Sequence, residues 1–337
     1  MLLVYDEMYG DHLRGIPHPE RPERVEVVAD FLRRRGDLAD ALSARDAGDA
    51  EIERVHSSGY LDLVTREVRG LHGHAGYLST GDTVVDERSL AVARRAAGGA
   101  IVAAQSAYER EGAAFAIVRP PGHHAESTRG VGFCVFNNAA IAARAVQDAC
   151  GARVLIVDFD YHHGNGTQAV SGDGLSYVST HGYPAYPGTG SADENYALPH
   201  HDAIVNVPLP PHRFGTEAFV ALWREALPRV VERVRPDMLI VSAGFDYTAG
   251  DPVGDLDVDV RAAAHLAAII EEQARLHCRG RVAYVLEGGY DTDALAQSVA
   301  MIVDLHRGAR PALGNADATA IPPAQRALLE RITDVLS

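Results

Sequence analysis

The sequence predicts an α/β fold: a single doubly wound domain with a mainly parallel sheet. Short runs that are apolar at every position alternate along the chain with longer segments of helical pattern. Strands buried on both faces form such continuous runs, and strand–helix alternation is typical of a parallel sheet covered by helices. The 337 residues contain no internal repeat or low-complexity linker, so we expect one domain over residues 1–337.

Strands are expected where an apolar run is short and ends at a polar or turn residue. Such runs lie at residues 1–5, 115–118, 154–157, 175–179, 238–242 and 282–286. Helices are expected over residues 22–35, 86–105, 138–149, 216–235, 260–276 and 292–306. The first of these helices would begin with Pro22, because the fixed φ of proline suits the first helical turn.

The charged residues exclude several classes of protein. The chain contains 31 basic residues, and every one of them is an arginine. Enzymes that need a Schiff-base lysine, a phosphate-loop lysine or a lysine general base are therefore excluded. The 46 acidic residues bring the formal net charge to −15. This charge repels nucleic acid and anionic membranes and favours cationic ligands, so we expect neither nucleic acid nor a membrane as a partner.

The cysteines and the N-terminus indicate a cytoplasmic protein. Cys134, Cys150 and Cys278 are odd in number and far apart, which disfavours both a disulfide framework and a cysteine zinc site. Residues 1–5 lack the basic region and the cleavage site of a signal peptide. No run approaches the roughly 18 apolar residues that a membrane span needs.

Polar residues beside glycines or prolines follow four of the predicted strands. They form the segments RPPGHH at 119–124, DFDYHHGNG at 158–166, AGFD at 243–246 and EGGY at 287–290. Ligands of open α/β sheets bind beyond the carboxyl ends of the strands. We therefore expect these four segments to form one site at that edge of the sheet.

The segment that begins at Asp158 predicts a metal site. In an extended strand end, alternate residues face the same way, so Asp158, Asp160 and His162 converge on one side. Carboxylate and imidazole donors aimed at one point suit a divalent cation such as zinc, iron or manganese. The alternative is a hydrogen-bonded cluster of carboxylates and histidine without a metal.

The chain resembles the histone deacetylase superfamily, which includes bacterial class II-like deacetylases and acetylpolyamine amidohydrolases of the arginase/deacetylase fold. The matching motifs are HPERPER at 18–24, RPPGHH at 119–124, GFC at 132–134, DFDYHHGNG at 158–166, YPGTG at 186–190, SAGFD at 242–246, GDP at 250–252 and EGGY at 287–290. They occur in the family's order over residues 1 to about 305. The resemblance implies an eight-stranded, mainly parallel sheet in a single deacetylase domain.

The resemblance also implies the metal ligands. One zinc ion per chain would be held by Asp160, His162 and Asp246, with Fe²⁺ or Mn²⁺ as alternatives. Ser179 and Thr180 fall where the family binds a structural potassium ion. A homodimer is one assembly compatible with the sequence.

Five residues fall at positions that carry catalysis in the family. Asp158 would orient His123, and His124 would be the general base with Asn165 as its neighbour. An asparagine supports the protonated form of His124 less well than an aspartate would, because it carries no negative charge. Tyr290 would donate a hydrogen bond to the oxyanion of the tetrahedral intermediate.

The expected substrate site is a narrow acyl-chain tunnel with an acidic rim. Gly132, Phe133 and Tyr186 match its walls, although both aromatic rings would also suit a core. Asp82 aligns near the family's rim aspartate, and the other interpretation is a polar residue at a helix entry. Val253 stands where polyamine-specific relatives carry an acidic gatekeeper.

An apolar Val253 disfavours that mode of polyamine selection, but other acidic rim residues remain candidates for it. Asp82, Glu20 and Glu23 are the acidic residues that we consider for such a role. The expected substrates therefore include acetyl-lysine side chains as well as small cationic acylated amines such as acetylated polyamines.

We expect a zinc-dependent amidohydrolase that converts N-acetyl amides of alkyl amines to free amine and acetate. The first alternative is a two-metal ureohydrolase of the arginase type, which has the same fold. It is disfavoured because the chain carries D-x-D-x-H at 158–162, and Asp246 is followed by Tyr247 and Thr248 without a further aspartate. The second alternative is a non-catalytic sensor of acylated amines, against which the intact His123, His124 and Tyr290 argue.

Overall fold

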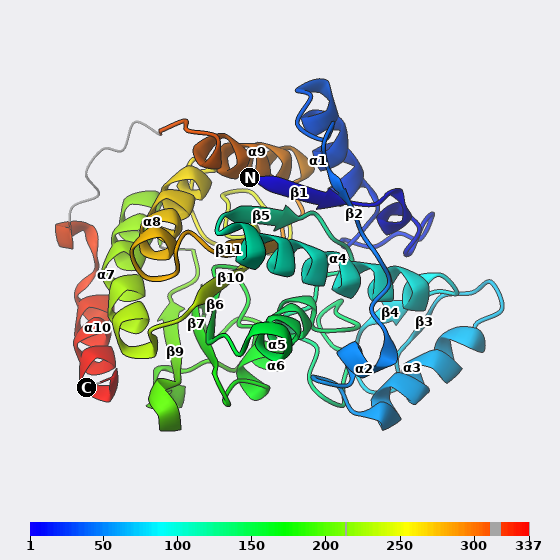
Figure 1. Cartoon of the computed structure of the whole chain (residues 1–337), viewed down its shortest axis with the longest axis horizontal. Helices are drawn as coiled ribbons and strands as arrows, with labels where there is room; N and C mark the ends of the chain where they lie inside the picture. Colours follow the sequence, from blue (N-terminus) through cyan, green and yellow to red (C-terminus); the bar gives the residue numbers. More distant parts are fainter. Residues whose placement is uncertain (213, 311–317, 337) are drawn as a thin grey trace.

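The largest element of the protein is a nine-stranded sheet with the strand order β2-β1-β5-β11-β10-β6-β7-β9-β8 (Figure 1). In the computed structural model, which describes residues 1–212, 214–310 and 318–336, every pairing from β2 to β9 is parallel, and β8 is antiparallel to β9. The strands are β1 (Leu2–Tyr5), β2 (Leu42–Ser43), β5 (Ala113–Ala116), β6 (Val154–Asp158), β7 (Leu175–Gly182), β8 (Tyr196–Ala197), β9 (Ala203–Leu209), β10 (Met238–Ala243) and β11 (Val282–Leu286).

Helices cover both faces of this sheet. The α-helices of the described residues are α1 (Glu23–Arg34), α2 (Asp49–Ile52), α3 (Ser58–Arg69), α4 (Ser89–Arg110), α5 (Asn138–Cys150), α6 (Asn165–Ala169), α7 (Thr216–Val234), α8 (Ala262–His277), α9 (Thr292–His306) and α10 (Pro323–Leu336). Helices α4 and α5 pack together on β1, β5, β11, β6 and β10, while α1, α9, α8, α7 and α10 form a continuous second layer (Figure 1).

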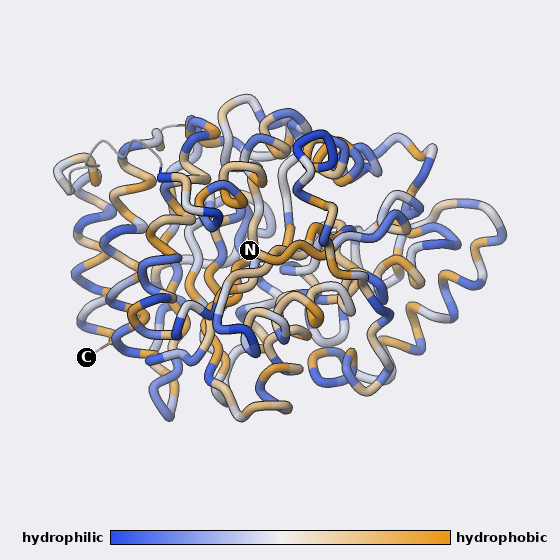
Figure 2. The backbone as a smooth tube through the Cα atoms, turned by 45° about the horizontal axis from the view of Figure 1, so that its top comes forward, coloured by the Kyte–Doolittle hydropathy of each residue, from blue (hydrophilic) through white to orange (hydrophobic). Residues whose placement is uncertain are grey.

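The apolar residues gather where these layers meet. Strands β6, β10 and β11 are buried over their whole length, and Figure 2 shows the apolar residues concentrated along the inner segments of the tube. The outer helices instead alternate between apolar and polar positions along the tube, which is typical of helices with one buried face. None of the helices in the described ranges has the length and apolar character that crossing a membrane requires.

The α/β fold with a mainly parallel sheet is confirmed, and the sheet contains one strand more than expected. Eight strands run parallel, as the resemblance implies, and the antiparallel β8 at the edge is the ninth. The sequence did not predict β9, because Asn206 and Pro208 interrupt its apolar run. The run at 115–118 continues beyond β5, where Ile117 N still donates to Val4 O of β1 at 2.9 Å.

Most helix bounds agree with the prediction to within a few residues. The expected helix at 86–105 begins later, because the hydroxyl of Ser89 bonds the backbone N–H and the carboxylate of Asp86 in a turn before α4. A small antiparallel hairpin of β3 (Gly76–Tyr77) and β4 (Val84–Val85) precedes this helix. Its turn contains Asp82, which the hairpin brings to the site described next.

Candidate active site

The four polar segments lie beside one another at the carboxyl edge of the sheet. They follow β5, β11, β10 and β6, which are four consecutive neighbours in the strand order. Because all four strands are parallel, their carboxyl ends meet at the same edge. The topology therefore brings together residues separated by more than a hundred positions in the sequence.

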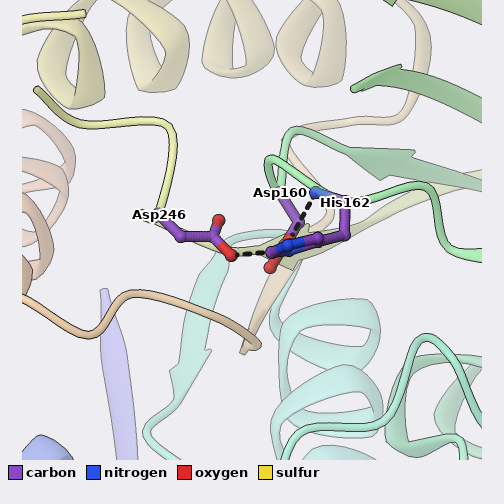
Figure 3. A group of neighbouring side chains, drawn as sticks. All are labelled: Asp160, His162 and Asp246. Carbon is purple, nitrogen blue, oxygen red and sulfur yellow. Dashed lines mark hydrogen bonds and ion pairs between the residues drawn. The ribbon is translucent and has the colours of Figure 1, made fainter. Parts of the chain in front are cut away.

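Asp160, His162 and Asp246 form a compact buried group in this edge (Figure 3). His162 Nδ1 lies 3.2 Å from Asp160 Oδ1 and 3.0 Å from Asp246 Oδ2. One donor atom from each residue lies within 4.8 Å of the others. These are the three residues expected as metal ligands.

The electrostatics of this group suit a cation. Burial and the neighbouring Asp160 carboxylate raise the pKa of Asp246 to about 7. Burial opposes the charged form of His162, but hydrogen bonds to both carboxylates outweigh it and raise the pKa of the imidazole to about 9. Two carboxylates withdrawn from water therefore need a positive charge between them, and carboxylate oxygen and imidazole nitrogen are both zinc ligands.

The backbone comes close to this group at Gly288. Its N–H donates to Asp160 Oδ2 at 2.8 Å, and a Cβ there would lie 2.6 Å from the same oxygen and closer still to Asp246 Oδ2. A side chain at this position would therefore displace the carboxylates. This close approach explains why the first glycine of the EGGY segment, Gly288, cannot carry a side chain.

His123 is held by Asp158, which is supported in turn by Tyr177 of the neighbouring strand. Its Nδ1 lies 3.1 Å from Asp158 Oδ2, which also accepts the hydroxyl of Tyr177 at 3.0 Å. Burial disfavours the charged imidazole, but the Asp160 and Asp158 carboxylates outweigh it and raise the pKa of His123 to about 10. His123 therefore carries a positive charge at neutral pH, next to the metal-ligand group.

His124 is held in one tautomer by an amide. Its Nδ1 lies 2.8 Å from Asn165 Oδ1, and Asn165 Nδ2 donates to Glu126 Oε1 at 2.8 Å. The glutamate orients the amide so that its oxygen faces His124, and Nδ1 must then be the donor. Burial and the charged His123 lower the pKa of His124 well below its ordinary value. The neutral ring consequently keeps Nε2 free to accept a proton.

Tyr290 closes the site from the segment after β11. Its ring lies edge-on to Phe133 at 6.0 Å between centroids, and the Arg24 guanidinium lies 4.7 Å from its centroid. Burial raises the pKa of the Tyr290 phenol well above its ordinary value. The phenol therefore keeps its proton and can act as a hydrogen-bond donor.

The expected wall residues lie against His124 and Tyr290. Tyr186 lies edge-on to His124 at 5.2 Å, and its side chain is 41% exposed, so it forms a rim and not a core contact. Asp82 Oδ1 accepts the N–H of Gly132 at 2.8 Å and the hydroxyl of Tyr186 at 3.3 Å. The structure thus places Gly132, Phe133, Tyr186 and Asp82 together.

The other three residues considered for the rim, Val253, Glu23 and Glu20, have different environments in the structure. Val253 is partly exposed in the loop after β10. Glu23 is exposed at the start of α1. Glu20 is fully buried, with Oε1 at 3.0 Å from Arg24 and 2.6 Å from Arg119. A role for Glu20 at the rim is therefore wrong, since its charge is used inside the protein.

The positions expected to bind potassium lie in β7. The hydroxyl of Ser179 lies 2.9 Å from His181 Nδ1. Thr180 Oγ1 is buried and has no hydrogen-bond partner among the described residues. These oxygens suit a cation, and the potassium site stays a prediction.

Sequence reasoning assigned no role to two residues that support the site, Glu287 and Tyr177. Glu287 Oε2 accepts the N–H of Gly122 at 2.6 Å and that of His123 at 3.1 Å, and Tyr177 supports Asp158 from within β7. The EGGY segment drew attention to Glu287 but did not indicate what its carboxylate does. Tyr177 lies within an apolar run, and nothing in the sequence distinguishes it from its neighbours in the strand.

Comparison with known proteins assigns most of the chain to one family. The profile of the family described as "Histone deacetylase domain" matches residues 18–306. Histone deacetylase 15 of Arabidopsis thaliana is 34% identical over 319 residues, covering 92% of this chain and 56% of that protein. A probable deacetylase of Archaeoglobus fulgidus is 35% identical over 298 residues, covering 86% of this chain and 81% of that protein. The chain thus spans little more than half the length of the plant relative and most of the archaeal one.

A solved structure shares the whole architecture. The crystal structure of the HDA15 HD domain superposes with a TM-score of 0.87 at 32% sequence identity, covering 99% of this chain and 93% of that one. The likeness therefore includes the sheet, both helix layers and the edge at which the polar segments meet.

Proposed function

This chain belongs to the histone deacetylase family, and from that premise we propose that it is a zinc-dependent deacetylase of N-acetylated alkyl amines. The reaction is the hydrolysis of the amide C–N bond by one water molecule, which yields the free amine and acetate. Acetyl-lysine side chains and small acetylated amines are the proposed substrates.

The observation that carries this proposal is the pairing of an acid–base residue with a metal-ligand group. His124 presents a free Nε2, because Asn165 holds the proton on Nδ1. Asp160, His162 and Asp246 together supply donors for one divalent ion. When bound there, zinc would acidify a water molecule and polarise the amide carbonyl.

His124 and Tyr290 perform the proton steps in this mechanism. Nε2 of His124 accepts a proton from the attacking water and later returns it to the nitrogen of the leaving amine. The Tyr290 hydroxyl donates a hydrogen bond to the carbonyl oxygen as negative charge develops on it, worth about 3 kcal/mol in comparable sites. The Asp160 and Asp158 carboxylates favour the protonated form of His123, which would add a positive charge beside the reacting groups.

The wall residues select the substrate by width. Phe133 and Tyr186 bring aromatic edges to Tyr290 and His124, where the acetamide must lie to react. Aromatic walls accept a slender alkyl chain without hydrogen bonds. Val253 cannot stabilise a distal ammonium, so acetyl-lysine-type substrates are proposed over long polyamines.

The geometry disfavours the ureohydrolase. Such an enzyme needs two metal ions, and within the described residues one group of three ligands is present, formed by Asp160, His162 and Asp246. Tyr290 would also have no role in the release of urea. A non-catalytic sensor would not need the neutral tautomer that Asn165 and Glu126 impose on His124.

Acetate release tests the proposed function. Wild-type protein is assayed with an acetyl-lysine peptide and with acetylated alkyl amines, before and after metal removal by a chelator and readdition of zinc. We expect activity that is lost on chelation and restored by zinc. Tyr290→Phe should lower kcat by about 10²-fold or more while metal content stays normal.

The metal assignment is checked on the same preparations. Elemental analysis should find about one divalent ion per chain in wild-type protein and a marked loss in Asp246→Ala. Release of urea from arginine, without release of acetate, would favour the ureohydrolase. Near wild-type turnover by Tyr290→Phe would contradict the role of its hydroxyl.

A further inference from the structure

Asp251 makes four hydrogen bonds that join two loops of the candidate site. Oδ1 accepts the backbone N–H of Val253 at 2.9 Å and that of Gly254 at 3.1 Å. Oδ2 accepts the backbone N–H of Tyr290 at 2.6 Å and that of Asp291 at 3.0 Å. The first pair lies in the loop after β10 and the second pair in the segment after β11.

One end of this connection rests on a metal-ligand residue. The loop leaves β10 through Asp246 and returns to it at Gly254, where a Cβ would overlap the backbone carbonyl of Asp246. Thr248 and Val258 close the base of the loop, where Ala249 N donates to Val258 O at 2.8 Å. The position of Gly254 is therefore set by the same loop that presents Asp246.

The other end fixes the backbone of Tyr290. Asp291 is the N-cap of α9, and its own carboxylate accepts the N–H of Asp293 and of Ala294 at 3.1 Å each. Tyr290 thus lies directly before a capped helix, with its N–H held by Asp251. A shift of this N–H would move the phenol relative to the metal-ligand group.

From this geometry we propose that Asp251 is a positioning residue for Tyr290, which holds its hydroxyl in register with Asp246. The proposal deepens the proposed function and rests on it, because it assigns no new reaction. Asp251 is 8% exposed and its four hydrogen bonds are to backbone N–H groups, so it acts through the backbone of Tyr290. A carboxylate is required because each of its two oxygens accepts two N–H groups. An asparagine has one oxygen, and its NH₂ group would face two backbone N–H donors that it cannot accept.

A double-mutant cycle with Tyr290→Phe tests this proposal. Asp251→Asn should lower kcat for an acetylated alkyl amine by about tenfold, with KM within about twofold of wild type and metal content unchanged. In the Tyr290→Phe background, the same substitution should lower kcat by less than about twofold, because the hydroxyl that it positions is already absent. Asp251→Glu keeps the charge but moves it by one methylene, and it is taken through the same cycle in case Asp251→Asn does not fold.

Asp202→Asn is the matched control. Asp202 is a buried carboxylate that accepts the backbone N–H of Gly174 at 2.8 Å, near the amino ends of β7 and β9 and so at the opposite edge of the sheet. This variant should lose stability without a change in kcat. An equal loss of kcat in both Tyr290 backgrounds, or loss of metal in Asp251→Asn, would overturn the positioning role. An inactive wild-type enzyme would instead contradict the proposed function itself.

Discussion

At the residue scale, the candidate site depends on positions where the backbone itself contacts a reactive group. Gly288 brings its N–H to Asp160, and there is no space for a side chain beside the two carboxylates. Asn165 determines which nitrogen of His124 carries the proton, through one amide oriented by Glu126. Single atoms at such positions therefore fix the carboxylates of the expected metal site and the tautomer of His124.

Substitution of Gly288 tests the close approach to the metal-ligand group. Gly288→Ala should lower metal affinity by about 10-fold or more, because the added methyl group displaces Asp160 and Asp246. Elemental analysis after dialysis against a weak chelator measures the loss. Gly59→Ala is the control, since Gly59 lies in α3 with open space where a Cβ would be. Full metal retention in Gly288→Ala would contradict the close approach.

Substitution of Val253 tests whether this residue of the rim determines the substrate preference. Val253→Glu should raise kcat/KM for acetylated diamines relative to acetyl-lysine peptides by about tenfold, which corresponds to about 1.4 kcal/mol. The reason is that a carboxylate can stabilise the distal ammonium. Val253→Gln, which adds similar bulk without charge, should leave the ratio unchanged. If wild-type enzyme strictly prefers polyamines and Val253→Glu alters nothing, selection occurs elsewhere.

At the scale of elements, buried polar side chains join segments that carry the site. His56, between α2 and α3, lies 2.8 Å from Glu126 O through Nδ1 and accepts the N–H of Asn137 at Nε2, at 2.9 Å. These bonds hold both ends of the loop that contains Phe133 and leads to α5. The bond from Asn137 requires the neutral ring, because a protonated Nε2 could not accept a hydrogen bond.

The connection through His56 predicts a dependence of stability on pH. Burial lowers the pKa of His56 to about 4, whereas an unfolded chain has the ordinary value of about 6.5. Below about pH 6.5 the unfolded state binds more protons, so His56 lowers the free energy of unfolding as the pH falls toward 4. The contribution at pH 5 is about 2 kcal/mol less than at pH 7.

Urea unfolding of a pair of histidine variants measures this contribution. His56→Gln should reduce the difference between the free energies of unfolding at pH 7 and pH 5. His74→Gln should retain the wild-type difference, because His74 is exposed. An unchanged difference in His56→Gln would show that this ring is not the source of the pH dependence.

At the scale of the whole molecule, the net charge of −15 creates a long-range attraction for cations. The proposed substrates carry positive charge beyond the acetamide, as a free ammonium or as basic neighbours of a lysine. Attraction of this kind acts on association and weakens as salt screens it. The field of the protein therefore favours cationic acetylated amines before any contact with the rim.

Ionic strength tests this attraction. The Debye length falls from about 30 Å at 0.01 M salt to about 8 Å at 0.15 M. Over this range we expect kcat/KM for an acetylated diamine with a free ammonium to fall by about threefold or more. A neutral N-acetylated monoamine of similar length should show little change. An equal response of both substrates would indicate a salt effect on the enzyme and not on the encounter.

The sequence by itself determined the fold class and the main chemical groups of the site. Apolar runs and helical patterns involve residues that are close together in the sequence, so they were sufficient to predict the parallel sheet. Strand β9 was not predicted, because Asn206 and Pro208 interrupt its apolar run. The proximity of Asp160, His162 and Asp246 was predictable because Asp160 and His162 follow one strand end and the family motifs supplied Asp246, whereas their role as metal ligands stays a prediction.

Tertiary structure alone decided which distant residues meet. Tyr186 and Asp82 are 104 positions apart, and Asp251 and Tyr290 are 39 apart, yet each pair is hydrogen-bonded. It also decided that Glu20 is buried between two arginines and not placed at the rim. The physical reason is that parallel strands bring remote loops to one edge, where single side chains bond to backbone groups and leave no periodic pattern in the sequence.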